Sequence, residues 1–224
     1  MPRSTRDRPA KAPLSIEAVI DAGLRVLRAE GIDAVSMRRV AAELDTGAAS
    51  LYVYVNNRQD LLNQMFDAVA GQIDLSDKPD PKRWREQLER LLTAARDAMD
   101  RYPGIARVPL ANVPTGPNAI RASDHLLGIL RAGGVNDRSA AWFADVVFLY
   151  VNAAAFERSI YVAEGAEEAD LQAEIEATFT HLDPATYPNI VALMPYLTSG
   201  EGDERFAFGL RLMINGLLNT EPPG

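Results

Sequence analysis

Side chains that commonly carry catalysis or hold metals are sparse in this sequence. The chain has no cysteine, and its two histidines, His125 and His181, are too far apart to suggest a local ligand pair. It lacks a Ser/His/Asp arrangement, a glycine-rich phosphate loop and an HExxH pattern, and acidic pairs such as Glu167-Glu168 fall on a face expected to be solvated. We therefore expect no enzyme, no bound metal and no cofactor.

Positive charge is unevenly distributed along the chain. The net charge is -8, but residues 1–60 carry nine Lys and Arg against eight Asp and Glu, whereas residues 61–224 carry fourteen against twenty-three. The first thirteen residues are basic and rich in proline, and such an arm can approach phosphates, although a solvated disordered tail is the simpler interpretation. The overall acidity therefore does not exclude binding of nucleic acid by the first part of the chain.

A group of polar and aromatic side chains lies in TGAASLYVYVNN, residues 46–57. Its β-branched and aromatic residues would ordinarily predict a strand, but no neighbouring run offers a pairing partner. A helix that starts at Ala48 places Leu51 and Val55 one turn apart on the core side and turns the other side chains elsewhere. The context therefore favours a helix.

The preceding residues supply the rest of a helix-turn-helix. Ser15 begins a periodic apolar run that should end near Gly31, and Ser36 can cap a second helix. The turn 45–47 follows, in which Gly47 can adopt a positive φ without steric cost. A helix, a turn with glycine and a short helix with outward polar groups is the layout in which the last helix enters the major groove of DNA. The stretch from residue 48 is therefore a candidate recognition helix.

The remainder of the chain predicts helices separated by proline and glycine. Four prolines in 103–117 are too many for a continuous helix. A long helix near 138–164 is apolar nearly all round, which indicates burial on more than one side. Other helices are expected near 58–72, 83–101, 126–132 and 206–217, with an acidic amphipathic segment at 167–181.

Residues 15–69 resemble the DNA-binding domain of the TetR family of bacterial transcriptional regulators, above all in LYVYVNNRQDLL. Three later stretches, GIARVPLANVPTGPNA, LRAGG and GDERFAFGLRLMINGL, resemble the regulatory domain of its tetracycline-repressor branch. The resemblance implies an all-α protein with a basic flexible arm (1–14), a three-helix helix-turn-helix DNA-binding domain (15–60) and a larger helical domain for ligand binding and dimerisation (61–224).

The resemblance also implies the residues that contact DNA: Ser36, Arg38, Ala49, Ser50, Tyr52, Tyr54 and Arg58. Arg38 holds the position at which the family reads a base edge, which suits a guanidinium that can pair bidentately with guanine. Ser50 and Tyr52 hold positions of base or phosphate contacts, and Tyr54 and Arg58 hold positions near the phosphate backbone. Taken singly, each could be a surface charge, a core cover or a cap, but together in one frame they favour a DNA surface.

One departure concerns the operator. Ala48 and Ala49 begin the recognition helix where tetracycline repressors have larger or more polar residues. Part of the base readout must therefore differ, and the operator of those repressors cannot be assumed here.

The small-molecule site implied by the family is expected among the residues Met65, Trp84, Met99, Tyr102, Phe148, Asn152 and Phe156. This set is apolar with few polar atoms, which favours a largely apolar or aromatic effector without an obligatory metal. Metal-bound tetracycline requires a histidine in ARVPLA, where this chain has Pro109, and Asp74 replaces a second histidine. Leu91 and Ala95 replace its polar and aromatic contacts, so tetracycline itself is not expected.

The family also implies a homodimer, because its long and last helices pack against their copies around a twofold axis. The small residues Ala153, Ala154 and Ala155 permit close approach of helices there, although a core internal to a monomer is the alternative.

The function implied is that of a ligand-responsive transcriptional regulator, a repressor that a small molecule releases from a pseudo-palindromic DNA operator. The alternative is a helical ligand- or partner-binding protein that has lost specific DNA binding. The N-terminus lacks the apolar core of a signal peptide, and no run of 18 or more apolar residues follows. We therefore expect a cytoplasmic protein that does not associate with membranes.

Overall fold

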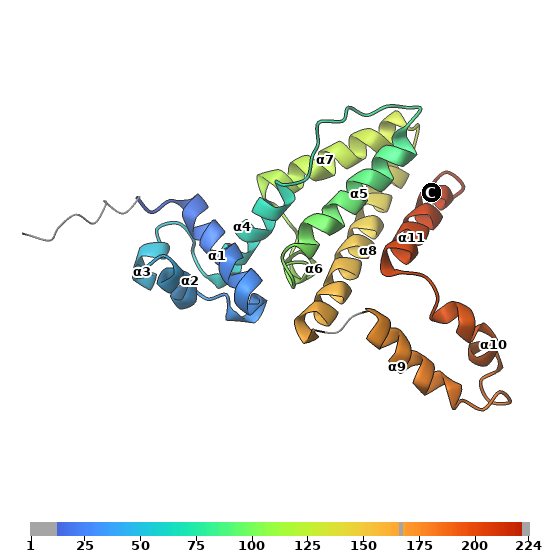
Figure 1. Cartoon of the computed structure of the whole chain (residues 1–224). Coiled ribbons are helices and arrows are strands. Elements are labelled where there is room, and N and C mark those ends of the chain that lie inside the picture. Colours follow the sequence, from blue (N-terminus) through green and yellow to red (C-terminus); the bar gives the residue numbers. More distant parts are fainter. Residues whose placement is uncertain (1–12, 166–167, 221–224) are drawn as a thin grey trace, which may run out of the picture. The chain divides into compact units, whose positions relative to one another are not determined.

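The computed structural model describes residues 13–165 and 168–220, which form eleven α-helices and one short 3-10 helix with no strand among them (Figure 1). The all-α class is therefore confirmed. The chain divides into two compact units, the first ending at Leu61 and the second beginning at Leu62. This division falls inside helix α4 (Arg58–Ala70), so the helix belongs to both units. Most of the predicted basic arm lies outside the described residues.

The helices of the first unit before α4 are α1 (Ile16–Glu30), η1 (Ile32–Ala34), α2 (Met37–Glu43) and α3 (Ala48–Leu51). Serine caps begin both longer helices, as the sequence predicts: Ser15 Oγ accepts a hydrogen bond from the backbone N–H of Ala18, and Ser36 Oγ accepts one from that of Arg39, each at 3.2 Å. Helix α1 ends at Gly31, whose φ of 84° is in the left-handed region.

The turn between α2 and α3 differs from the expectation. Gly47 has φ -82° and is the extended N-cap of α3, whereas Asp45 takes the left-handed conformation at φ 49°. Aspartate tolerates this region because its short polar side chain can hydrogen-bond locally. The positive φ that the sequence allows at Gly47 therefore occurs two residues earlier, at Asp45.

The stretch after Gly47 folds as a short helix and a following turn, which confirms the helical interpretation. Leu51 is fully buried, Val55 is nearly so, and the N–H of Val55 donates to the carbonyl of Leu51 at 3.0 Å. These two side chains anchor the element to the core of the first unit. The side chains of Tyr52 and Val53, which lie between them, remain exposed.

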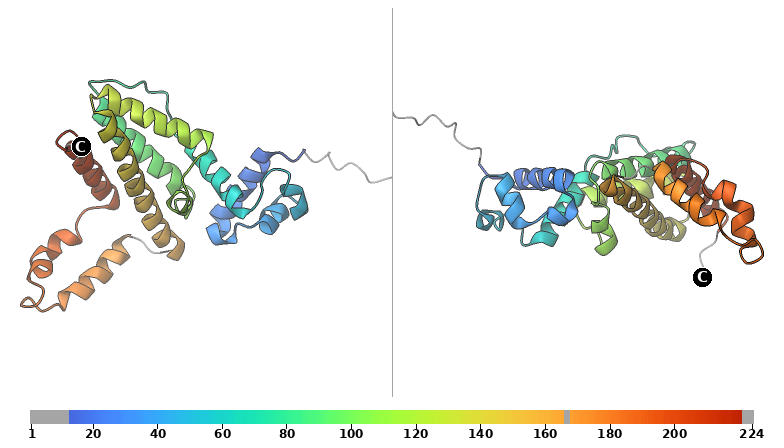
Figure 2. Two further views of the ribbon diagram at one scale, coloured as in Figure 1. Left: turned by 180° about the vertical axis from the view of Figure 1, so that it is seen from behind. Right: turned by 60° about the horizontal axis from the view of Figure 1, so that its bottom comes forward.

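The second unit contains the rest of α4 and the helices α5 (Trp84–Asp100), α6 (Arg107–Ala111), α7 (Pro117–Ala132), α8 (Asp137–Glu164), α9 (Glu168–Thr180), α10 (Pro188–Leu197) and α11 (Gly202–Leu217). Helices α5, α7 and α8 pack on one another, and α11 lies against α5 and α8 (Figure 2). Helices α9 and α10 pack on each other. As expected, no continuous helix spans 103–117: α6 is a five-residue helix between turns.

Helix α8 is buried on one side within the described chain, not on two. Val147 and Val151 are buried on its inner side, but Trp142, Val146 and Leu149 expose about half of their surface. The helix is long and apolar enough to cross a membrane by those criteria alone, but packing on α5, α6, α7 and α11 identifies it as a core helix. Its outer side leaves an apolar face uncovered in a single chain.

Helix α10 was not anticipated from the sequence. It begins with Pro188 at its first position and contains Pro195, and prolines are ordinarily taken as helix breakers. None of its residues is buried, although most of them are apolar. Its packing on α9 therefore leaves Tyr196 and Leu193 largely exposed.

A charged cluster joins α5, α8 and α11. Arg96, whose side chain is 7% exposed, forms ion pairs with Asp97 at 2.9 Å and Asp203 at 3.0 Å, and its guanidinium lies over the ring of Phe206. Arg158 pairs with Asp100 at 3.6 Å and with Asp203 at 3.2 Å. These contacts fix the last helix to the centre of the second unit.

Candidate nucleic-acid interface and effector cavity

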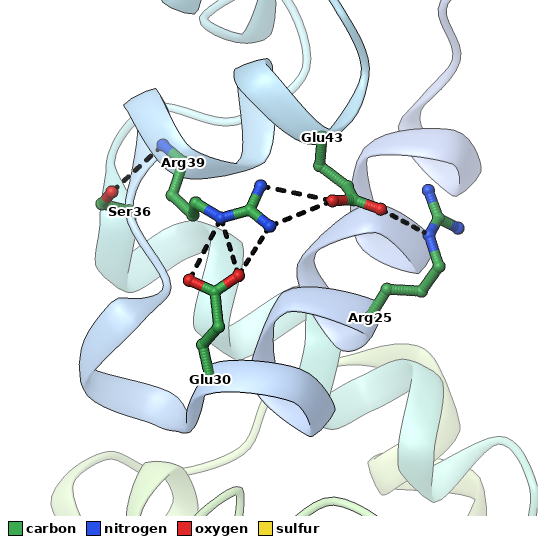
Figure 3. Close-up of polar contacts among 5 residues, drawn as sticks. All are labelled: Arg25, Glu30, Ser36, Arg39 and Glu43. Carbon is green, nitrogen blue, oxygen red and sulfur yellow. Dashed lines mark hydrogen bonds and ion pairs between the residues drawn. The ribbon is translucent and has the colours of Figure 1, made fainter.

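Two consecutive arginines on α2 have opposite environments. The guanidinium of Arg39 is held by Glu30, with Nη2 2.6 Å from Oε1, and by Glu43, with Nη2 3.2 Å from Oε2 (Figure 3). Arg25 also pairs with Glu43 at 3.2 Å, and its hydrogen bond, together with that of Arg39, holds the pKa of the Glu43 carboxyl below its usual value. Arg38 is exposed and makes no hydrogen bond or ion pair with any described residue. Its guanidinium is therefore available to an external partner.

The other described arginines of the first unit are engaged. Arg28 makes an interaction within the protein. Arg58 donates from Nε to the carbonyl oxygen of Val35 at 2.6 Å and from Nη2 to that of Ile32 at 2.8 Å. It thus secures the end of η1 to the start of α4. Within residues 13–61, Arg38 is the arginine whose guanidinium has no partner among the described residues.

The candidate recognition helix presents few polar groups to solvent. Ala49 is exposed, Tyr52 is 56% exposed, and Val53 is 80% exposed. Ser50 is half-buried, and Thr46 lies within 3.4 Å of its hydroxyl. Sequence reasoning did not single out Val53, although a β-branched residue beside an exposed tyrosine suits contact with a thymine methyl group.

Two other predicted DNA contacts have partners inside the unit. Ser36 is the cap of α2 described above. The hydroxyl of Tyr54 donates to the carbonyl oxygen of Leu14 at 2.5 Å, and this bond ties the turn after α3 to the residue before the Ser15 cap. With Arg58, these residues hold the fold of the unit, and their contacts with DNA stay predictions.

The second unit contains an apolar cavity of about 100 Å³ between α4, α5, α7 and α8. All of its lining side chains are apolar except Ser123 and Asn152, and none of the described lining residues carries a charge. Ser123 is exposed, whereas Asn152 is only 1% exposed. The cavity is thus suited to a largely apolar molecule, with one buried amide available to orient it.

Three of the seven predicted ligand residues line this cavity: Met99, Phe148 and Asn152. The other four do not: Met65 and Trp84 are buried in packing elsewhere, Tyr102 accepts a hydrogen bond from Gln72 at 2.9 Å, and Phe156 is half-buried farther along α8. Leu91 and Ala95, named in the sequence as departures from tetracycline repressors, also line it. A core residue and a cavity residue of α5 or α8 look alike in sequence because both are apolar.

A carboxylate that the sequence did not mark joins two walls of the cavity. Asp67 of α4 accepts hydrogen bonds at Oδ1 from the backbone N–H groups of Asn118 and Ala119, both at 2.9 Å, and so caps α7. A Cβ on Gly116 would lie 2.1 Å from this carboxylate, so the approach requires glycine. The signal in the sequence was Pro117 at the first position of a helix whose N-cap glycine has no side chain to cap it.

Comparison with known proteins identifies the family to which a chain with this helix-turn-helix and this apolar cavity belongs. The family model for bacterial regulatory proteins of the tetR family matches residues 19–65, and that for the tetracyclin repressor-like C-terminal domain matches residues 78–220. The second match alone covers more than half of the chain. The chain belongs to the TetR family.

Its TetR-family relatives include the HTH-type transcriptional repressor DrrR1 of Streptomyces coeruleorubidus, which is 30% identical over 225 residues, covering 95% of this chain and 82% of the relative. The tetracycline repressor protein of class G from Vibrio anguillarum is 26% identical over 199 residues, covering 88% and 90%. Among solved structures, the TetR family protein ActR of Streptomyces coelicolor in complex with actinorhodin is 37% identical with a TM-score of 0.84, covering 92% of this chain and 96% of that one.

These findings give the TetR-family assignment its functional content. The protein is a ligand-responsive, DNA-binding transcriptional repressor, as the resemblance implied. The family consists of soluble transcriptional regulators, and transcriptional regulators are not a class of enzymes.

Proposed function

We propose that two copies of this chain bind a pseudo-palindromic operator and that Arg38 reads a base in each half-site. The observation that carries this proposal is the contrast on α2, where Arg39 is neutralised by Glu30 and Glu43 while Arg38 is exposed and unpaired among the described residues. An acidic protein binds DNA only where positive charge is concentrated, and an unpaired guanidinium is the best reader of guanine. Tyr52, Val53 and Ala49 extend the contact surface on the exposed side of the candidate recognition helix.

The second copy is proposed to cover the apolar faces of α8 and α11. On α8, Trp142, Val146 and Leu149 are spaced by four and three residues and are followed after four more by the exposed Ala153. On α11, which packs against α8, Phe208 and Leu212 are 59% and 58% exposed. Contiguous apolar stripes on two adjacent helices favour a self-complementary interface, and the twofold axis it creates would pair the DNA-binding units. Half-sites about one turn of DNA apart follow from that symmetry.

The effector is proposed to bind in the apolar cavity and to act through α4. Phe66, Val69 and Ala70 of α4 line the cavity, and the same helix begins in the first unit at Arg58. A ligand that binds more tightly to a conformer with α4 displaced shifts the population away from the DNA-binding state. The structure of the relative ActR in complex with actinorhodin supports binding of a small molecule. We propose a largely apolar or aromatic effector here, bound without a metal ion.

Cytoplasmic location is proposed as well, because a repressor must reach the chromosome.

The other candidate function, a ligand- or partner-binding protein without specific DNA binding, has one observation in its favour. The exposed start of the recognition helix is Ala49, which has no hydrogen-bonding side chain.

Adjacent arginines provide a matched test of the DNA proposal. Arg38→Ala and Arg39→Ala each remove one positive charge from α2. Arg38→Ala is expected to lower operator affinity by roughly 1–3 kcal/mol with little change in thermal stability, because its target is a base. Arg39→Ala is expected to lower stability and to leave base preferences intact. Fluorescence anisotropy with the duplex that the wild type enriches from random DNA and with its scrambled form, together with thermal melts, measures both effects. Equal effects of the two variants on discrimination between these duplexes would contradict the proposal.

A further inference from the structure

The chemistry of the effector cavity restricts its ligand more than its apolarity alone. None of the described lining residues is charged or titrates near neutral pH. An ionised group placed inside would lose its hydration without gaining a counter-ion. The part of the ligand inside the cavity is therefore uncharged.

Size sets a second limit on what the cavity holds in this conformation. Its volume is about 100 Å³, whereas an apolar protein cavity of about 150 Å³ accommodates benzene. The cavity thus holds at most one ring without movement of its walls, and a larger ligand extends past the exposed Ser123 of the lining or separates the helices.

Asn152 is the buried polar residue of the lining, and its orientation is fixed by a helix carbonyl. Its Nδ2 donates to the carbonyl oxygen of Phe148 at 2.8 Å. A carbonyl oxygen only accepts, so the nitrogen must face it and Oδ1 must face away. Oδ1 accepts no hydrogen bond from a described residue. The described residues also do not enclose it fully, so a small part of its surface stays accessible. The amide oxygen is therefore unpaired among the described residues without being fully enclosed, and it belongs to a residue of the cavity lining.

We propose that Asn152 Oδ1 selects a neutral aromatic effector that carries a hydroxyl or N–H donor on the ring that enters the cavity. This inference rests on the proposed function, since it assigns the chemistry of the same effector site. An unpaired buried amide oxygen gains from a ligand donor, and an apolar or anionic substituent leaves it unpaired or repels it.

Four one-ring probes of similar size separate these cases: para-fluorophenol, para-fluorotoluene, para-fluorobenzaldehyde and para-fluorobenzoate. They offer respectively a donor, an apolar group, an acceptor only and a charge, and phenols are neutral at pH 7. Binding to the full-length protein is followed by fluorine NMR line broadening. The wild type is compared with Asn152→Leu, which keeps the branching and the number of side-chain heavy atoms, and with Ser123→Ala as the control at the other polar residue of the lining.

The expected result is a change in relative affinity. In Asn152→Leu, the Kd of fluorophenol rises at least about tenfold relative to that of fluorotoluene, whereas in Ser123→Ala the ratio is unchanged. Asn152→Leu lowers the affinity for fluorobenzaldehyde less than the affinity for fluorophenol. Fluorobenzoate binds the wild type more weakly than the other three probes. If Asn152→Leu does not fold, Asn152→Thr and Asn152→Val supply the same contrast, because they are isosteric and differ in one hydroxyl.

Two failures are distinguishable. Binding of the neutral probes with a phenol-to-toluene ratio that Asn152→Leu leaves unchanged, or an equal loss for the aldehyde, would overturn this inference and leave the effector cavity in place. No binding of any probe up to its solubility limit would overturn this inference and the cavity proposal together, while the proposal for Arg38 would stand.

Discussion

The two units of the chain differ in where a hydrogen-bonding group lacks a partner among the described residues: on the surface in the first unit and inside a cavity in the second. In the first unit nearly every described arginine is committed to an internal partner, and Arg38 is left facing solvent. In the second unit the buried Arg96 lies in a cluster of ion pairs away from the cavity lining, and the cavity wall is apolar except for Ser123 and Asn152. We propose that each site gains its specificity from this difference: on the surface one polar group is left without a partner among paired ones, and in the cavity one polar group is left without a partner among apolar ones.

The largest expected effect comes from adding a charge to an exposed surface, which is apolar on α8 of the second unit and polar on α2 of the first. Ala153→Arg on α8 should place a charge in the proposed dimer face, whereas Ala42→Arg on α2 adds the same charge to a polar surface; both alanines are exposed in the single chain. Burying an unpaired charge costs about 3–5 kcal/mol, so Ala153→Arg should weaken dimerisation by at least roughly a hundredfold. Sedimentation velocity at micromolar concentration should show a monomer for Ala153→Arg only. A wild type that sediments as a monomer would remove the basis for the interface.

A second substitution pair sharpens the assignment of the cavity. Ala95 lines the cavity and its half-buried neighbour Ala94 does not, so Ala95→Phe should fill the space that a ligand needs while Ala94→Phe leaves it open. Overpacking costs about 1–3 kcal/mol, and probe binding should weaken by roughly tenfold or more in Ala95→Phe alone. Fluorine NMR with para-fluorophenol measures this loss, and anisotropy checks that DNA binding persists. Equal probe affinities in the two variants would place the ligand elsewhere.

A third prediction tests whether Arg58 serves the fold or a phosphate. Loss of its bonds to the carbonyls of Ile32 and Val35 should destabilise the first unit by roughly 1–3 kcal/mol. Arg58→Lys should recover only part of this, because an ammonium cannot span both oxygens with a planar fork. Hydrogen exchange of the amides in α1 and α2 of the full chain is the measurement. Unchanged exchange in Arg58→Ala, with a lower salt dependence of DNA binding, would assign the residue to phosphate alone.

The smallest expected effect concerns Asp100 in the charged cluster. Burial raises the pKa of this carboxyl, against the lowering effect of Arg158 and Arg96, and its Oδ1 is enclosed without a hydrogen bond. Because the folded pKa lies above the unfolded one, stability is lost as the pH rises through the folded pKa and the carboxyl ionises. Asp100→Asn should therefore be more stable than the wild type above that pKa, by roughly 1 kcal/mol or less, and the difference should vanish in acid.

Denaturation at several pH values, with Asp124→Asn on α7 as the exposed control outside the cluster, measures this difference. A stability advantage of Asp100→Asn that persists undiminished in acid would show that ionisation is not its source. An Asp100→Asn protein that is less stable than the wild type at neutral pH would show that the ion pairs outweigh burial.

How much the sequence could predict also divides between the units. Features that depend on residues within a few positions of one another are confirmed. They are the caps at Ser15 and Ser36, the buried pair Leu51 and Val55, and the helix after Gly47. The partner of Arg58 lies more than twenty positions away, so nothing near Arg58 in the sequence marked it.

The cavity depended still more on long-range packing. Met99, Phe148 and Asn152 lie on different turns of α5 and α8, and what separates them from Met65 or Trp84 is the spacing of helices, which apolar periodicity does not encode. The cap that Asp67 provides for α7 joins positions more than fifty residues apart. Helix α10 was not predicted because it contains two prolines, Pro188 at its first position and Pro195 inside it. A proline that begins a helix and a proline that breaks one look the same in sequence.

Selection from random duplex DNA tests the central claim most directly. The wild-type protein should enrich an inverted repeat whose half-sites lie about one helical turn apart, and Arg38→Ala should lose selectivity at one position of each half-site while Arg39→Ala keeps it. An enriched pool without twofold symmetry, or an Arg38→Ala pool with the base preferences of the wild type, would contradict the account.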